Sequence, residues 1–567
     1  MPPPSAPVPP GPVPAGPVPA PSNGPTAAST PVETGTIGDI DPESIGLYSP
    51  SEGGLGAALW KGTPRDLVTQ LLPALNLPTY SPLLNNLAQR FLLTTADVPA
   101  GKVAGGPSLT SMRVNRLVEL GDAKDAWKLI ALSKPDLVDE ITLRQTAEAG
   151  LLSTESTNIC SRLPEIIKSY KSPEWQKLLV VCQLMAKDTK AAQLTLDMLH
   201  TQNVQDETFF FIAERNIIAA NKQLPRQLTP LKPLTLALIK LSDLPLPGEV
   251  FAHPDAALIP FLINMKAKDD NARLALADRA AERGLINAGQ LEEVYASIAF
   301  TPAVLSNAFD SKETGSRLHA LLYQAAIQDK TAPKHITLAV KFVETASPAG
   351  LNGAQGEVLE DMAGIVPATD ENNASSAALA RIYIASNKPQ SALEWLKQAK
   401  HAAVGMPAVA ASLKDVWPLA VLSGLELDSD YPQDLSKWLD TTLKPFDPKD
   451  NNHADRDIAA SLLLLFDADG FAVPEDAWAR VLSAPATERH TVPSAALLER
   501  LRAASNVGKR GEVVLFSLLL GGANADDPSF LATLDIIRAL RLTGLTADAA
   551  ALARETAARI LAPPAKP

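Results

Sequence analysis

Pairs of Ser, Thr or Asp followed by a proline recur along this chain and mark where helices begin. The pairs are Thr63 with Pro64, Ser81 with Pro82, Ser172 with Pro173, Thr301 with Pro302, and Asp527 with Pro528. The first residue of each pair accepts a backbone N–H as an N-cap, and proline fits the first helical turn, where its missing donor is not needed. The pairs therefore predict a chain made of many separate helices.

Between these pairs, apolar residues recur at helical spacing. One helical face consists of Trp175, Leu178, Leu179, Cys182, Met185 and Ala186. Alternation of apolar and polar residues, which indicates a strand, is absent over four or more residues. Aromatic residues make up 5% of the chain, whereas β-rich proteins rely on aromatic and β-branched side chains. We therefore predict an all-α fold.

Short breaks between the predicted helices indicate how the helices pack. Helices of about 10–17 residues joined by about 2–8 residues form antiparallel neighbours. At 567 residues the chain exceeds the roughly 250–300 residues at which a single core stops growing. We therefore predict a right-handed α-solenoid of antiparallel helical hairpins, with roughly 20–26 helices. Segments 116–127, 379–396 and 537–553 resemble degenerate tetratricopeptide-like hairpins, with a turn residue between helices and an Ala on the second helix.

The ends of the chain have a different composition. Residues 1–33 hold 13 of the 48 prolines and almost no charge, so they bury too little surface to offset their ordering entropy. Residues 34–56 are also poorly patterned. We predict a disordered Pro/Ala/Gly-rich tether at 1–56, two halves of the solenoid at 57–300 and 301–562, and a disordered tail at 563–567.

Charge and hydropathy exclude several classes of partner. The net charge of −12 disfavours nucleic-acid binding, which needs a basic surface to neutralise phosphates. No stretch reaches the roughly 18–20 consecutive apolar residues that a membrane span requires. We expect no nucleic acid, no transmembrane segment and no cofactor.

No catalytic or metal-binding motif is present. The chain lacks GxGxxG before a helix, a Walker phosphate loop, a GxSxG elbow and HExxH. The seven histidines never take the i,i+3 or i,i+4 spacing of a helical metal pair, so we expect surface or capping roles for them. A superhelical lytic transglycosylase is the enzymatic alternative, but neither Glu512 nor Glu555 lies in the sequence context of its catalytic Glu.

The two cysteines, Cys160 and Cys182, lie at equal distances from residue 171, in a predicted turn. In an antiparallel hairpin this symmetry places them at the same height, on faces that both meet the shared interface. A disulfide in an oxidising compartment is one interpretation. Two buried free thiols are the other, and Pro164 would disturb the match if it kinked the first helix.

Both ends of the helical region resemble an uncharacterised family of alphaproteobacterial envelope proteins. The N-terminal match comprises Leu59, Trp60, Lys61, Gly62, Thr63, Leu71, Leu72, Pro73, Ser81, Pro82, Ala88, Gln89, Arg90, Phe91, Leu92 and Leu93. The C-terminal match comprises Gly511, Glu512, Leu518, Gly521, Gly522, Leu540, Gly544, Leu545, Ala549, Leu552 and Ala553. The resemblance implies a periplasmic location and no assigned activity. The chain departs from it by lacking an export signal, so the cytoplasm is the alternative location.

These features together favour a non-enzymatic protein-interaction scaffold of the bacterial cell envelope. Solenoid curvature generally provides a concave surface for partner proteins. The alternatives are a cell-wall-associated enzyme and a structural spacer that self-associates as a homo-oligomer.

Overall fold

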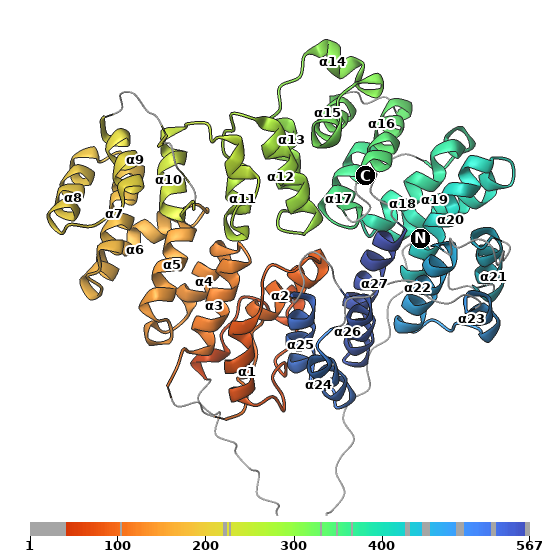
Figure 1. The fold of residues 1–567 in the computed structure, drawn as a ribbon, viewed down its shortest axis with the longest axis horizontal. Coiled ribbons are helices and arrows are strands. Elements are labelled where there is room, and N and C mark those ends of the chain that lie inside the picture. Colours follow the sequence, from red (N-terminus) through yellow and green to blue (C-terminus); the bar gives the residue numbers. More distant parts are fainter. Residues whose placement is uncertain are drawn as a thin grey trace, which may run out of the picture. The chain divides into compact units, whose positions relative to one another are not determined.

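The computed structural model describes residues 41–101, 105–218, 224–225, 228, 230–328, 332–346, 350–364, 367–425, 431–444, 454–482, 493–522 and 529–561. Residues 1–40 of the predicted tether and the predicted tail at 563–567 lie outside them. The described residues contain 27 α-helices (Figure 1). Apart from three isolated bridges, they contain no β-structure. The prediction of an all-α fold is confirmed.

The helices follow one another along the chain with short connections. The first nine are α1 (Arg65–Leu71), α2 (Pro82–Leu93), α3 (Leu109–Glu119), α4 (Ala123–Leu132), α5 (Glu140–Gly150), α6 (Ser156–Ser169), α7 (Pro173–Met185), α8 (Thr189–Thr201) and α9 (Glu207–Ile218). The next nine are α10 (Pro233–Ser242), α11 (Ile259–Leu262), α12 (Asp270–Glu282), α13 (Ala288–Ala296), α14 (Pro302–Ser306), α15 (Gly315–Gln328), α16 (Ala332–Thr345), α17 (Ala354–Ala363) and α18 (Ser376–Ala385). The last nine are α19 (Pro389–Ala403), α20 (Pro407–Leu422), α21 (Tyr431–Thr442), α22 (Ala454–Ala468), α23 (Glu475–Val481), α24 (Ala495–Asn506), α25 (Arg510–Gly522), α26 (Phe530–Leu542) and α27 (Thr546–Ile560). Very short helices such as α11 and α14 raise the number above the predicted range.

Most of the predicted helix starts are found in the structure. The Ser81 side chain caps α2 by accepting the Leu84 N–H, and the Thr301 side chain caps α14. Ser172 stands at the N-cap position of α7 without a side-chain capping bond. At α1 the N-cap position is Pro64, so the helix starts one residue later than predicted. Asp527 and Pro528 lie outside the described residues.

The three predicted hairpins are pairs of helices in contact, namely α3 with α4, α18 with α19, and α26 with α27. A left-handed residue turns the chain in each pair, because φ is +90° at Gly121, +56° at Asn387 and +80° at Gly544. The structure therefore contains the hairpins, whereas their tetratricopeptide likeness and the handedness of the array stay predictions.

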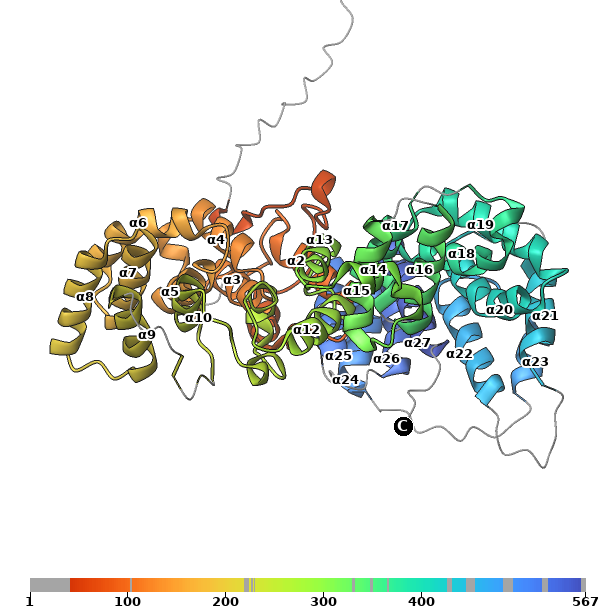
Figure 2. The ribbon, with the colours of Figure 1, turned by 90° about the horizontal axis from the view of Figure 1, so that it is seen from above.

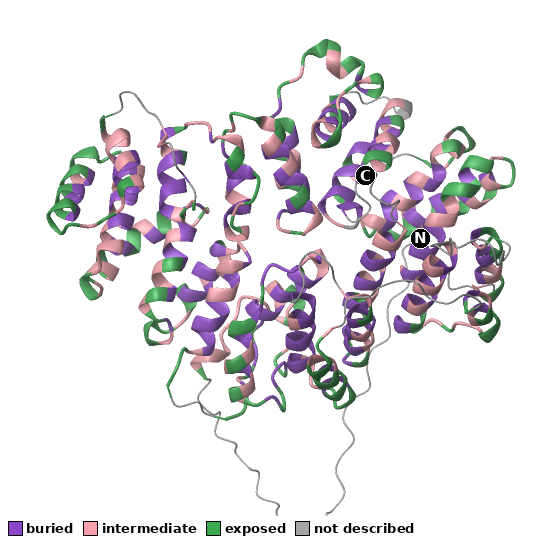
Figure 3. Cartoon of the chain, in the orientation of Figure 1, coloured by how far each residue is buried: buried purple, intermediate pink, exposed green. Residues whose placement is uncertain are grey.

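The array is continuous across the predicted boundary at 300/301. Helix α13 packs against α15, and α12 packs against both α15 and α17. Residues 41–567 accordingly form one unit, with one hydrophobic core that runs through the described helices (Figure 3). The predicted boundary at 300/301 therefore does not coincide with a break in the packing.

The C-terminal helices return to the start of the array, which the sequence did not predict. Helix α2 contacts both α25 and α27, and α25 lies beside α2 in both views of the fold (Figures 1 and 2). The Ser81 hydroxyl donates to the Glu555 carboxylate at 2.9 Å, and Arg90 forms a 2.6 Å ion pair with Asp548. Residues more than 450 positions apart therefore hold α2 and α27 together.

The predicted tether of 1–56 is wrong for residues 41–56, because these pack onto the helices. Leu55 is buried, and the backbone N–H groups of Leu47 and Tyr48 both donate to the Leu93 carbonyl. The Arg113 guanidinium donates to the Ile45 carbonyl at 2.6 Å. The segment consists of two three-residue 3-10 helices, Pro42–Ser44 and Pro50–Glu52, with irregular backbone around them, so its sequence shows no α-helical periodicity.

A buried polar cluster corrects the expectation that every histidine has a surface or capping role. His319 on α15 is 5% exposed, and its Nδ1 lies 2.8 Å from an Asp278 oxygen. The Tyr295 hydroxyl donates to the other Asp278 oxygen at 2.5 Å, and burial raises the pKa of Tyr295. The cluster joins α12, α13 and α15.

None of the helices in the described residues is both long and apolar enough to cross a membrane.

Candidate functional site: an amide-lined pocket

The residue pair singled out from the sequence is joined covalently. Cys160 on α6 and Cys182 on α7 form a disulfide, with sulfurs 2.02 Å apart and Cα atoms 5.5 Å apart. The two interpretations of these cysteines were a disulfide and a pair of buried free thiols, and the structure contains the disulfide. Pro164 lies inside α6 and does not interrupt it. The bridge links neighbouring helices, and neither cysteine lines the pocket described below.

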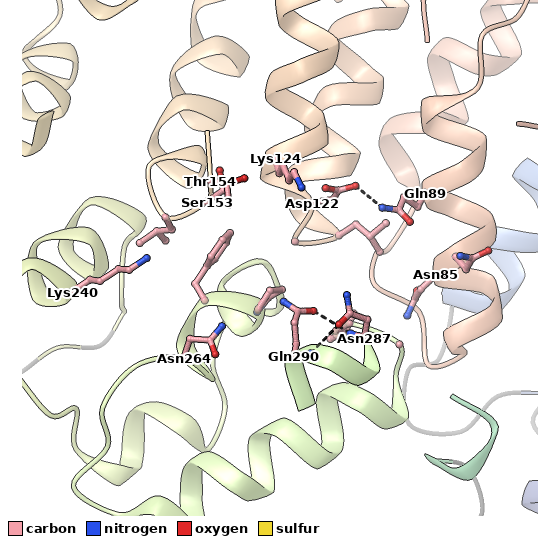
Figure 4. Close-up of a pocket in the computed structure, with 18 residues that line it drawn as sticks. Asn85, Gln89, Asp122, Lys124, Ser153, Thr154, Lys240, Asn264, Asn287 and Gln290 are labelled. Atoms are coloured by element: carbon pink, nitrogen blue, oxygen red, sulfur yellow. Dashed lines mark hydrogen bonds between the residues drawn. The ribbon is translucent and has the colours of Figure 1, made fainter. Parts of the chain in front are cut away.

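A pocket of about 570 Å³ lies where six segments of the chain meet (Figure 4). Its volume falls within the roughly 300–1,000 Å³ range of typical ligand pockets. The polar side chains that line it are Asn85, Asn86, Gln89, Asp122, Lys124, Ser153, Thr154, Lys240, Asn264, Asn287 and Gln290. Six of these eleven side chains are carboxamides. The segments are α2, the α3–α4 turn with the start of α4, the residues after α5, α10, α11 with the residues after it, and the α12–α13 connection with the start of α13.

Two glycines let these segments approach closely enough to form the pocket. Gly121 has φ +90°, and a Cβ there would lie 3.3 Å from Cγ of Pro260, so the α3–α4 turn packs on α11. Gly284 has φ +65°, and a Cβ there would lie 2.7 Å from Cβ of Pro82. Positive φ favours glycine because it has no Cβ. Any larger residue at Gly284 would push the end of α12 away from α2.

One wall of the pocket is fixed by Asn85, which is only 2% exposed. Its amide nitrogen donates to the Arg283 carbonyl at 2.8 Å and to the Thr79 carbonyl at 3.1 Å. Its amide oxygen accepts from the Thr79 N–H at 2.7 Å. These bonds occupy both the nitrogen and the oxygen of the amide. Asn85 therefore connects α2 to the end of α12 and has a structural role.

Two further polar pairs are held in place by helix capping. Asp122 caps α4 by accepting the Asp125 N–H, and its second oxygen accepts from the Gln89 amide at 2.7 Å. Burial, followed by the Asp125 charge, raises the pKa of Asp122. Asn287 and Gln290 form a capping box at the start of α13, with bonds of 2.9 and 3.1 Å. Helix capping thus fixes the orientation of the Asp122, Asn287 and Gln290 side chains in the absence of a ligand.

Five other polar side chains in the pocket have no partner among the described residues. Asn86, Lys124, Thr154, Lys240 and Asn264 are exposed, and their side chains form no hydrogen bond or ion pair with the described residues. Amides and hydroxyls both donate and accept, whereas lysines only donate. The pocket therefore presents a fixed polar wall together with free groups that can bind a ligand.

Apolar side chains complete the lining. These are Leu120, Leu152, Pro260, Phe261 and Leu285. Phe261 and Leu285 are half-buried. A cavity with convergent polar groups beside apolar surface suits a ligand that alternates polar and apolar groups. Among the described residues that line it, Asp122 is the single carboxyl group, and there is no histidine or cysteine.

The sequence analysis assigned none of the residues that line this pocket to a binding site, although it named Gln89 and the hairpin at 116–127 for other reasons. Its members extend from Asn85 to Gln290 and come from segments that only the fold brings together. The available signals were local, because Asp122 and Asn287 can be recognised as helix N-caps. Nothing in the sequence indicates that both caps face one cavity.

The described residues form an all-helical protein with a polar, amide-lined cavity. Comparison with protein-family models, with curated proteins and with solved structures found no match to this chain.

Proposed function

We propose that this chain is a non-enzymatic protein-interaction module that binds a segment of a partner protein in the amide-lined pocket. The observation that carries the proposal is the set of six carboxamide side chains around one cavity of about 570 Å³. A carboxamide offers a donor and an acceptor in the same plane, as a peptide bond does. Asn86 and Asn264 have both groups free among the described residues and are thus available to the backbone of a bound segment.

The apolar lining supports a peptide as the ligand. A peptide presents side chains at regular intervals beside its backbone, and Phe261 and Leu285 offer apolar surface for them. Hydrogen bonds to the backbone supply affinity in such complexes, and pockets for side chains supply specificity. This division of roles matches the mixed lining of the pocket.

The location that we propose is the bacterial periplasm, with the cytoplasm as the alternative. The support is the disulfide between Cys160 and Cys182, since disulfides persist in oxidising compartments and are rare in the cytosol. The net charge of −12 supports a partner other than nucleic acid.

The glutamates considered for the enzymatic alternative have structural partners. Glu512 is 1% exposed and forms a 2.8 Å ion pair with Lys509. Glu555 is 3% exposed and accepts from the Ser81 hydroxyl and the Leu83 N–H. These contacts favour structural roles for both residues over catalysis.

Selection of a displayed random peptide library on the full chain tests the proposal. Asn264→Trp and Thr154→Trp place a large side chain at exposed positions of the pocket, and Thr201→Trp, at an exposed position of α8, is the matched control. We expect peptides that bind the natural protein and Thr201→Trp equally and lose at least tenfold in affinity on each pocket variant.

Three outcomes would contradict the proposal. One is that no peptide is enriched, and another is that the enriched peptides bind the pocket variants as well as the control. The third is pocket-dependent binding of an oligosaccharide in place of a peptide. Light scattering on the same samples shows whether the occupant is instead a second copy of the chain, because the mass would then fall on dilution.

A further inference from the structure

We infer that three side-chain amides of the pocket orient one peptide group of the bound segment, with its carbonyl oxygen toward Asn287 and Gln290 and its N–H toward Gln89. This inference rests on the proposed function and adds the residues that decide how the segment lies. All three side chains line the pocket. Figure 4 draws Asn287 and Gln290 on one side of the cavity and Gln89, beside Asp122, on the opposite side.

Asn287 and Gln290 each have the oxygen of the amide in use. Oδ1 of Asn287 accepts from the Gln290 N–H at 2.9 Å, and Oε1 of Gln290 accepts from the Asn287 N–H at 3.1 Å. A backbone N–H only donates, so the amide oxygens and not the nitrogens must occupy these bonds. The two amide nitrogens form no hydrogen bond with the described residues. This side of the pocket therefore presents free donors.

Gln89 has the other half of its amide in use. Its Nε2 donates to Oδ2 of Asp122 at 2.7 Å, while Oδ1 of Asp122 accepts the Asp125 N–H at 3.2 Å. Oε1 of Gln89 has no hydrogen bond to the part of the chain that the structure describes. This side of the pocket therefore presents a free acceptor. Lys124, on the same side, is exposed and held by no such bond, so it does not set the pattern.

A peptide group matches this arrangement. In a planar trans peptide group the C=O and the N–H point in opposite directions. One group lying across the pocket therefore offers its oxygen to the donors of Asn287 and Gln290 and its N–H to the acceptor of Gln89. The reverse orientation would place a carbonyl oxygen against the Gln89 oxygen and an N–H against amide nitrogens, and it would leave these polar groups unpaired.

Two variants keep the capping box of α13 and change its free half. Gln290→Glu keeps an oxygen for the Asn287 N–H, since Glu is also a capping-box residue, but replaces the free donor by an acceptor. Asn287→Ser keeps an N-cap and removes the free donor without adding charge. Affinity for the strongest peptide from the selection described above should fall about tenfold or more in Gln290→Glu and about fivefold in Asn287→Ser. Both variants should melt at the temperature of the natural protein.

A change in the peptide backbone tests the contact with Gln89. The same peptide is synthesised with capped ends and with one backbone amide at a time replaced by an ester, which has no N–H. At one position the ester should weaken binding about fivefold. Gln89→Lys still donates to Asp122 but has no acceptor, so it should bind the ester and the amide at that position equally. Esters at other positions should affect both proteins by the same factor.

The matched control for added charge is Asn271→Asp, at an exposed position in the first turn of α12 outside the pocket. It adds the same charge as Gln290→Glu and should leave the affinity unchanged. Tighter binding by Gln290→Glu would show that the ligand presents donors to α13 and would overturn the inferred orientation.

The two proposals fail in different ways. Suppose that a peptide binds in the pocket, as shown by its loss in Asn264→Trp. Unchanged affinity in both α13 variants, or an ester effect of the same size in Gln89→Lys and the natural protein at every position, would then overturn the inferred orientation and leave the proposed function standing. If no peptide binds in the pocket, both proposals are overturned.

Discussion

The Arg113 side chain, on α3, joins residues 41–56, through Ile45, to the end of α2, and its replacement by methionine tests that role. Its Nε donates to the Leu92 carbonyl at 2.6 Å, one Nη to the Ile45 carbonyl at 2.6 Å, and the other Nη to the Thr94 carbonyl at 3.1 Å. Burial lowers the pKa of Arg113 to about 10, so the group remains charged at neutral pH.

The magnitude follows from these three bonds. Each hydrogen bond to a charged group contributes about 1.5–3 kcal/mol, which gives roughly 4.5–9 kcal/mol for the set. Methionine removes the cost of burying the charge and restores part of the packing, but it leaves three carbonyls without a donor. We therefore expect Arg113→Met to lower stability by about 3–5 kcal/mol, a large fraction of the roughly 5–15 kcal/mol of a typical domain.

Amide hydrogen exchange measures the effect locally. The N–H groups of Leu47 and Tyr48 both donate to the Leu93 carbonyl, so their protection reports whether this segment stays attached. Arg113→Met should reduce that protection by two orders of magnitude or more. In Arg113→Lys, which keeps the charge but cannot donate to all three carbonyls, the protection of these two N–H groups should lie between that of the natural protein and that of Arg113→Met. Protection within a factor of five of the natural protein would refute the reasoning.

Two further predictions concern pH and redox state. Burial and the neighbouring Asp361 raise the pKa of Glu292 to about 7 from 4.5, so the folded state binds more protons than the unfolded state between these values, and stability should fall as pH rises from 5 to 8. In urea titrations, Glu292→Gln should make the free energy of unfolding less dependent on pH, whereas Glu293→Gln should leave the pH dependence unchanged. The same pH dependence in both variants would contradict the assignment to Glu292. The disulfide closes a loop with a sequence separation of 22, so replacing Cys160 and Cys182 by Ser should cost about 3 kcal/mol. Thiol titration of the denatured, unreduced natural protein should find no free thiols, and two would contradict the bridge.

The fold class could be predicted because helices carry local signals. Ser81 and Thr301 cap helices in the structure as their sequence context predicts, and Gly121 and Gly544 turn the chain between predicted helix pairs. N-caps and left-handed turn residues depend on a few neighbours, so one sequence is enough to find them.

Long-range contacts could not be predicted in the same way. Ser81 carries the signal of an N-cap, but nothing marks Glu555 as its partner 474 residues later. Likewise, His319 shows no sequence sign of its buried bond to Asp278 on another helix. The pocket belongs to this second class, because packing alone brings Gln89 and Asp122 to the same cavity as Asn264.

The most direct test of peptide binding in the amide-lined pocket is hydrogen exchange of the full chain with and without the strongest selected peptide. We predict new protection in the segments that line the pocket, at 120–124, 152–154, 260–264 and 284–290, and its loss in Asn264→Trp. Protection confined to other helices, or binding without protection at any of these four segments, would contradict the account.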